Sequence, residues 1–298
     1  MAIFRNSPDK VWDAISKSLP DIGQVVHKQS LSGGSINAAY RIETKSNQSY
    51  FVKLNRESLL PMFEAEAEGL VELRKVNAIR VPEPIGCGAS DGYAWIVTEY
   101  IEFGRGDAET QSRFGHQFAE MHRFGSARYG WHRNNTIGST PQINDWNDNW
   151  IEFYRNHRLG FQLELAVRNG FTGSIQKKGE RVMVDLENFF SSYVPVPSLM
   201  HGDLWGGNHG VDAKGDPVIF DPAVYYGDRE ADLAMTSLFG GCSTTFYDAY
   251  GEAWPLDEGY SVRKTLYNLY HVLNHANLFG GGYAMQAESM MDQLLAEI

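Results

Sequence analysis

The sequence predicts an α+β fold in two lobes, in which a small antiparallel sheet plus one helix precedes a larger, mainly helical lobe that carries a short hairpin. Three observations lead to this prediction. Alternating apolar and polar residues occur in the first hundred positions, apolar residues at helical spacing dominate the later ones, and "DAKGD" interrupts the second half as a tight turn. We place the lobes at residues 1–101 and 102–298.

The front lobe divides into strands and helices along the chain. Residues 7–19 predict a short helix with apolar residues on one side. Residues 25–55 predict three strands separated by turns, because apolar and polar side chains alternate. Residues 59–76 change to helical spacing, a proline-containing break follows at 81–86, and the apolar run 93–103 predicts a buried strand.

The back lobe is mostly helical in its pattern. Phe114, Phe118 and Met121 are spaced i, i+4, i+7, which places them on one face of a helix. Four stretches have this character: residues 109–124, 145–170, 177–193 and most of 228–298. Between them, residues 199–222 contain two short apolar runs around the turn, which predicts a hairpin inserted among helices.

Composition narrows the class of protein. The chain has 298 residues, 43% of them hydrophobic, and a formal net charge of −11, so neither nucleic acid nor an anionic membrane is an expected partner. We expect no signal peptide and no membrane span, because no basic region precedes an apolar core and no apolar run approaches 18 residues. Cys87 and Cys242 form no CxxC motif, which favours reduced thiols and a cytoplasmic location. The sequence does not define the oligomeric state, although a monomer is favoured.

The hairpin region carries polar residues that need an explanation. Asn208 lies five residues after Asp203. Asp221 lies at the end of the predicted strand "PVIF". A hairpin that returns on itself can bring Asn208 and Asp221 together, and a buried carboxylate is costly unless it is paired or binds a metal. Two such oxygen ligands suit Mg²⁺, and Asp203 would then be available to accept a proton.

These motifs resemble those of a known family. "HGDLWGGN" followed by "IFDP" resembles the catalytic loop and metal-binding aspartate of protein-kinase-like phosphotransferases, in the variant shared by aminoglycoside and choline kinases. "LMHGDLWGGN", "IFDPAVYYGDREADLAM", "LNHANLFGGGYA" and "NTIGSTPQ" are similar to fructosamine kinases, also called ketosamine-3-kinases. The resemblance extends over nearly the whole chain and implies a two-lobed protein-kinase-like fold.

A kinase of this kind needs a strand lysine on the nucleotide phosphates and a helix glutamate that holds it. Lys53 lies on the strand after the glycine-containing turn. Among the glutamates of the following helix, Glu66 shares the apolar face, whereas Glu64, Glu68 and Glu72 fall on the outer side as a solvated acidic stripe. Periodicity therefore selects Glu66 as the partner of Lys53; an ordinary strand–helix ion pair is the alternative.

The resemblance also implies further nucleotide and loop contacts. Gly33, Gly34 and Ser35 would form the glycine-rich loop over the phosphates, although the full GxGxxG motif is missing. Some fructosamine kinases carry a redox-active cysteine in this loop; because Ser35 stands there, we expect no disulfide-linked dimer. The remaining implied residues are the adenine-binding hinge, Glu99, Tyr100 and Ile101, and two residues that brace the catalytic loop, His201 and Asp232.

The activity implied by the resemblance is an ATP-dependent kinase that phosphorylates the 3-hydroxyl of a ketosamine, free or protein-bound. Asp203 would be the catalytic base, and Asn208 and Asp221 would bind Mg²⁺. The product is unstable and releases the amine, which is deglycation. Trp205 and His275 are candidates for the acceptor site, with loop packing equally open for Trp205.

Two other functions stay open from the sequence. A kinase for another hydroxylated amine, such as an aminoglycoside or choline, would use the same nucleotide residues. An ATP-binding pseudokinase is disfavoured, because Lys53, Asp203, Asn208 and Asp221 are all present.

Overall fold

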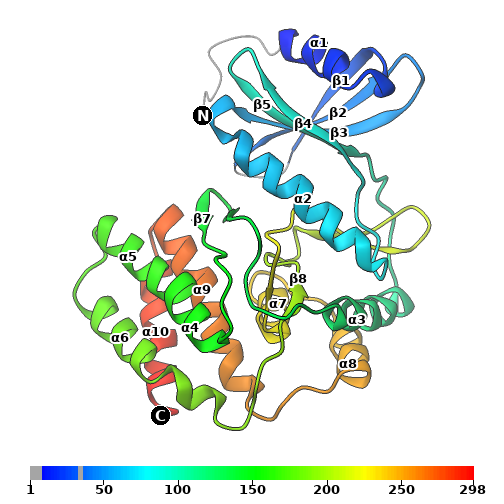
Figure 1. The fold of residues 1–298 in the computed structure, drawn as a ribbon. Helices are drawn as coiled ribbons and strands as arrows, with labels where there is room; N and C mark the ends of the chain where they lie inside the picture. Colours follow the sequence, from blue (N-terminus) through cyan, green and yellow to red (C-terminus); the bar gives the residue numbers. More distant parts are fainter. Residues whose placement is uncertain (1–8, 33–35) are drawn as a thin grey trace.

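The computed structural model describes residues 9–32 and 36–298 and shows a sheet-containing front lobe above a helical back lobe (Figure 1). The sheet has five antiparallel strands in the order β1-β2-β3-β5-β4. Its strands are β1 (Val25–Leu31), β2 (Ala38–Thr44), β3 (Ser49–Arg56), β4 (Pro84–Ser90) and β5 (Tyr93–Glu99). Two helices accompany it, α1 (Asp9–Ser18) and α2 (Leu60–Val76), with 3₁₀ turns at Pro20–Ile22 and Glu57–Leu59.

Strand β4 corrects the expectation of a simple break at residues 81–86. The strand begins at Pro84 and forms an edge of the sheet beside β5. Its residues are mostly small, and a Cβ at Gly88 would lie 2.6 Å from the Trp95 ring, so glycine is needed where that indole crosses the strand. An edge strand without β-branched alternation leaves no period-2 signal in the sequence, which is why the pattern missed it.

Helix α2 connects the sheet to the back lobe. Phe63, Leu70 and Leu73 are buried on its inner side in the main apolar core. The helix ends at Val76, and the next residue, Asn77, caps it in a left-handed conformation (φ 54°) and donates its N–H to the carbonyl of Arg74. Figure 1 shows α2 lying between the sheet and the back lobe, so it can be contacted from both.

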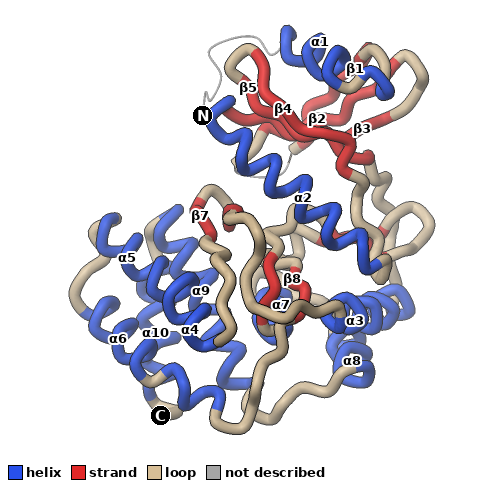
Figure 2. Tube along the Cα trace, in the orientation of Figure 1, coloured by secondary structure: helices blue, strands red, loops and turns tan. Residues whose placement is uncertain are grey.

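The back lobe confirms the helical expectation and adds several short strands (Figure 2). Its helices are α3 (Ala108–Arg123), α4 (Trp150–Tyr154), a π-helical turn (Arg155–Gly160), α5 (Phe161–Arg168), α6 (Ser174–Val184), a 3₁₀ turn (Leu186–Phe190), α7 (Arg229–Thr236), α8 (Thr244–Ala253), α9 (Tyr260–Phe279) and α10 (Tyr283–Leu295). Across the described residues, none of the helices has the length and apolar character that a membrane crossing requires. The lobe boundary at residue 101 stays a prediction; β5 ends at Glu99 and α3 begins at Ala108.

Three pairs of short antiparallel strands shape the loops of the back lobe. They are β6 (Asn135–Ile137) with β7 (Thr140–Gln142), β8 (Ser198–Met200) with β11 (Tyr225–Gly227), and β9 (His209–Val211) with β10 (Pro217–Ile219). The predicted hairpin is β9–β10, and Oδ1 of Asp212 accepts the N–H groups of Lys214 and Asp216 at its turn. Since β8 ends before Asp203 and β10 ends before Asp221, the two pairs bring both aspartates to one place.

Candidate active site

Lys53 lies in the middle of β3, between β2 and β5, and its side chain is 7% exposed. Its Nζ is 2.8 Å from Oε1 of Glu66 and 2.5 Å from Oδ1 of Asp221. Burial alone would lower the pKa of Lys53, but the two carboxylates outweigh it and raise the pKa above its usual value. Lys53 is therefore a buried, permanently charged ammonium that joins the sheet, helix α2 and the back lobe.

The selection of Glu66 by periodicity agrees with the observed contact, but the expectation for its neighbours is wrong. Glu64, Glu68 and Glu72 are not simply solvated, because each contacts the back lobe. Glu72 is 15% exposed and accepts the hydroxyl of Tyr226 at 2.7 Å. A single-helix pattern cannot show which outer residues a second lobe will cover.

The loop that carries Asp203 is held by Asp232. Oδ2 and Oδ1 of Asp232 accept the backbone N–H groups of His201 at 2.6 Å and of Gly202 at 2.8 Å. Burial opposes ionisation of Asp232, yet the neighbouring His122 and, after it, the N–H of Gly202 lower its pKa. Asp232 thus stays charged and fixes the loop from the start of α7.

A glycine and a buried histidine also constrain the loop that carries Asp203. Gly202 has φ +84°, and a Cβ there would lie 2.1 Å from the carbonyl oxygen of Ala223, so only glycine fits. His201 is buried, and its Nε2 lies 3.0 Å from the carbonyl oxygen of Phe220. Burial lowers the pKa of His201, so the neutral ring donates to that carbonyl and ties the Asp203 loop to the residue directly before Asp221.

Asn208 lies between the two aspartates. Its Nδ2 donates to the carbonyl oxygen of Asp203 at 2.8 Å, to Oδ2 of Asp203 at 3.1 Å and to the carbonyl oxygen of Asp221 at 3.4 Å. Because the amide nitrogen is engaged, Oδ1 is the atom of Asn208 that can ligate a cation. Asp221 has φ 57°, a left-handed conformation that aspartate tolerates better than most residues.

The donor chemistry of this place fits a hard divalent cation. It offers an amide oxygen and a carboxylate, with an ammonium nearby, which is a set of oxygen ligands rather than nitrogen or sulfur. Among the residues that the structure describes, no three His, Cys, Asp or Glu gather into a metal cluster. Burial first, and then the charge of Asp221, raise the pKa of Asp203 well above its usual value.

The expected hinge lies at the end of β5. The N–H of Glu99 donates to the carbonyl of Glu83 at 2.8 Å, so Glu99 can offer its carbonyl rather than its N–H to a base. Arg80 binds the carboxylate of Glu99 at 2.6 Å and also that of Asp212 in the hairpin turn. The Arg41 guanidinium covers the Tyr100 ring, and Ile101 is buried. The predicted contacts of Gly33, Gly34 and Ser35 lie outside the described residues.

The two acceptor-site candidates are Trp205, within the Asp203 loop, and His275 on helix α9. The Trp205 side chain is 38% exposed and folds over Gly207, where a Cβ would be 2.3 Å from the ring. The His275 ring packs against that of Phe239 in a tilted arrangement, with ring centroids 4.4 Å apart. The backbone N–H of Trp205 donates to the carbonyl oxygen of Asp203 at 3.2 Å, a contact within the loop itself. The acceptor roles of Trp205 and His275 stay predictions.

Sequence reasoning missed the role of the "NTIGSTPQ" segment in holding the Asp221 loop. Nδ2 of Asn135 donates to the carbonyl of Val224 at 2.8 Å, and Nε2 of Gln142 donates to that of Ala223 at 3.2 Å. Both amides belong to the β6–β7 hairpin and hold the backbone directly after Asp221. The sequence signal that could have indicated this role is the pair of amide side chains, Asn135 and Gln142, at the two ends of the segment.

Comparisons with known proteins agree with this geometry. A family model described as "Fructosamine kinase" matches residues 9–297. The chain is 46% identical to a "probable ketoamine kinase" of Synechocystis sp., covering 97% of this chain and 98% of that protein. It is 44% identical to the chloroplastic protein-ribulosamine 3-kinase of Oryza sativa subsp. japonica, covering 99% and 85%.

Solved structures extend the likeness to the fold. A crystal structure assigned as a fructosamine-3-kinase, from Haemophilus somnus 129PT, has a TM-score of 0.87 at 32% identity and covers 95% of this chain and 97% of that one. A choline kinase from Streptococcus pneumoniae, at 14% identity and a TM-score of 0.61, covers 97% and 99% and shares the fold alone. The expected protein-kinase-like fold is thereby confirmed.

Proposed function

We infer, because the chain belongs to the fructosamine kinase family, that it transfers the γ-phosphoryl group of ATP to the 3-hydroxyl of a ketosamine. The observation that carries this proposal is the meeting of Lys53 with both Glu66 and Asp221. This contact brings together, from three separate segments of the chain, the ammonium that binds nucleotide phosphates, the carboxylate that holds it and the carboxylate that can bind their cation.

The residues divide the work by position. Lys53, held by Glu66, binds oxygens of the α- and β-phosphates. Asp203 accepts the proton of the 3-hydroxyl while the hydroxyl oxygen forms the new bond to the γ-phosphorus. The bond between the γ-phosphorus and the β-phosphate oxygen breaks, and ADP leaves. Asp232 and His201 keep the Asp203 loop in place during this step. Orientation and charge stabilisation therefore supply most of the rate.

We propose that Oδ1 of Asn208 and the carboxylate of Asp221 hold Mg²⁺. When bound, the ion neutralises charge on the β- and γ-phosphates. The Lys53–Asp221 contact supports this assignment, because it places the carboxylate where phosphates bound by Lys53 would reach it. Phosphate oxygens and water would complete the coordination.

The test is a substrate panel. The purified chain, with ATP and Mg²⁺, is given ribulosamines, fructosamines, an aminoglycoside and choline, and ADP release is measured beside release of the free amine. Turnover confined to ketosamines, followed by amine release, is the expected result. Faster turnover of choline or the aminoglycoside would assign the chain to another amine kinase, and ATP binding without any transfer would indicate a pseudokinase.

We further propose that glycated small molecules or glycated proteins are the substrates and that the chain acts as a cytoplasmic monomer. Cys87 and Cys242 are both free, which supports an environment that keeps thiols reduced. Light scattering during size-exclusion chromatography measures the mass in solution, and a dimer would contradict the monomer.

A further inference from the structure

We propose that Arg133 is a positioning residue for the nucleotide site: it holds helix α2 against the back lobe in the rotation that presents Glu66 to Lys53. This inference rests on the proposed function, since it explains how the Lys53–Glu66 pair of that site is set. Arg133 lies just before β6, and its guanidinium contacts Glu64 and Glu68 rather than Lys53 or Glu66.

The guanidinium of Arg133 contacts two carboxylates on α2. Nη1 and Nη2 each lie 3.3 Å from Oε2 of Glu64, and Nη2 lies 3.4 Å from Oε1 of Glu68. Glu64 and Glu68 are four residues apart, so their like charges repel on the helix surface unless a cation lies beside them. One cation from the back lobe therefore serves both.

Glu66 lies between Glu64 and Glu68 in the sequence, so the contact of Arg133 with these two acids also affects where Glu66 lies. Two residues along an α-helix correspond to about 200° of rotation, so Glu64 and Glu68 lie roughly opposite Glu66. Arg133 holds the outer side of the same turns whose inner side carries Glu66. A rotation or shift of α2 away from Arg133 would move the Glu66 carboxylate away from Lys53.

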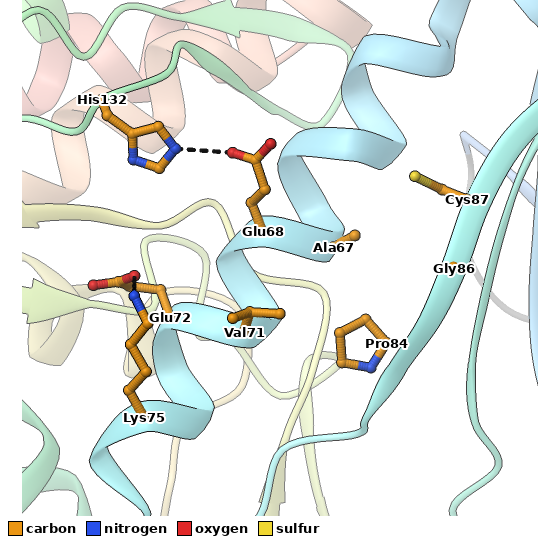
Figure 3. Close-up of a pocket in the computed structure, with 9 residues that line it drawn as sticks. All are labelled: Ala67, Glu68, Val71, Glu72, Lys75, Pro84, Gly86, Cys87 and His132. Atoms are coloured by element: carbon orange, nitrogen blue, oxygen red, sulfur yellow. Dashed lines mark hydrogen bonds and ion pairs between the residues drawn. The ribbon is translucent and has the colours of Figure 1, made fainter.

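Two neighbouring contacts extend the attachment along α2. Nε2 of His132 lies 2.9 Å from Oε2 of Glu68. Figure 3 shows this pair together with the other residues that line a pocket between α2 and β4. One turn further, the Tyr226 hydroxyl donates to Oε1 of Glu72. The acidic stripe is thus an inter-lobe contact surface on three successive turns.

The back-lobe side of this contact is firmly held. Nδ2 of Asn144 donates to the carbonyl of Arg133 at 3.1 Å, and Oδ1 of Asn134 accepts the N–H of Asn144 at 2.7 Å. Oδ1 of Asn144 in turn accepts Nη2 of Arg158 at 2.8 Å, and Arg158 is fully buried in the π-helical turn. Because the back lobe holds Arg133 in place, Arg133 fixes the position of α2 and does not move with it.

The ion pairs are too exposed to matter much for global stability. The side chain of Arg133 is 31% exposed and those of Glu64 and Glu68 are 39% and 41% exposed, and such pairs contribute little to folding. Their effect should appear in the geometry of the nucleotide site instead. A readout that separates ATP binding from unfolding can therefore detect it.

The experiment compares Arg133→Ala, Arg133→Lys and Arg128→Ala. Arg128 is a matched control, because it forms a 2.6 Å ion pair with Asp148 inside the back lobe and does not reach α2. For Arg133→Ala we expect the KM for ATP, and the Kd of a non-hydrolysable ATP analogue, to rise about tenfold, with the KM for the ketosamine unchanged. Arg133→Lys should recover part of the loss and Arg128→Ala should match the wild type.

A second set of variants tests whether repulsion between the two glutamates accounts for the effect. Adding Glu64→Gln and Glu68→Gln to Arg133→Ala should leave the KM for ATP no higher than in Arg133→Ala alone, since the repelling charges are gone. Unchanged analogue binding in Arg133→Ala, or a loss equalled by Arg128→Ala, would overturn the proposal. A wild-type chain that binds the analogue but turns over no ketosamine would refute the proposed function while the binding arms still decide the role of Arg133.

Discussion

The Lys53 ammonium lies 2.5 Å from Oδ1 of Asp221, although 168 residues separate the two along the chain. One residue is in the middle of the front-lobe sheet and the other follows a short hairpin strand of the back lobe. Their contact holds the two lobes together at the proposed nucleotide site, and three predictions depend on it or on the groups around it.

Replacing Lys53 should disable the nucleotide site. Lys53→Met removes the cation that the phosphates need and leaves Glu66 buried without its partner, so kcat/KM for ATP should fall by at least ~10²-fold. ADP release over a range of ATP concentrations measures this. Lys10→Met, at an exposed position of α1, is the control. An unchanged kcat/KM for ATP would remove Lys53 from the site.

Asp203→Asn should lower kcat by at least ~10²-fold, because an amide cannot take the proton of the acceptor hydroxyl. The substitution is nearly isosteric and the loop is held by Asp232 rather than by the Asp203 side chain, so the fold and ATP binding should persist. Single-turnover kinetics and analogue binding check the two parts. Turnover close to that of the wild type would refute the base assignment.

Asp221→Asn should weaken the response to Mg²⁺. Asparagine tolerates the left-handed backbone at this position, so the loop should keep its shape while one charged ligand is lost. The Mg²⁺ concentration for half-maximal ADP release should rise at least about tenfold, and chelation by EDTA should abolish activity in the wild type. Asp216→Asn, in the exposed hairpin turn, should behave as wild type. The same Mg²⁺ dependence in both variants would contradict the assignment.

His271 should make stability fall in acid. Burial, and then the proximity of His275, lower the pKa of His271 to about 3. Below the usual histidine pKa of about 6.5, the unfolded chain binds a proton there that the folded chain does not, so stability is full above that pH and decreases as pH falls. Between pH 7.5 and pH 5 the contribution of this group is about 2 kcal/mol.

Urea unfolding at these two pH values tests the histidine. His271→Leu should lose less stability than the wild type between pH 7.5 and pH 5, by about 2 kcal/mol. His27→Leu, at an exposed position of β1, should keep the wild-type difference. Equal pH dependence in His271→Leu and the wild type would show that the buried ring carries no such linkage.

Local patterns were sufficient for the main elements. The helical spacing around Phe114 and Phe118 predicted α3, and the turn "DAKGD" predicted β9–β10. Strand β4 was not predicted, because its glycines and alanine show no alternation of apolar and polar side chains. Its position depends on pairing with β5 and on the space that the Trp95 ring requires. Pairing partners that are remote in sequence leave no local signal.

The sequence by itself determined which side chains exist at which spacing: Lys53 on a strand, Glu66 on the apolar face of the next helix, and Asp203, Asn208 and Asp221 around a hairpin. Periodicity reports such facts because it follows from the geometry of a single strand or helix. Only the tertiary structure decided that Glu64 and Glu68 contact Arg133, that Glu68 also contacts His132, and that Glu72 contacts Tyr226. That outcome depends on how two lobes pack, and the surface that covers a helix is formed by residues far along the chain.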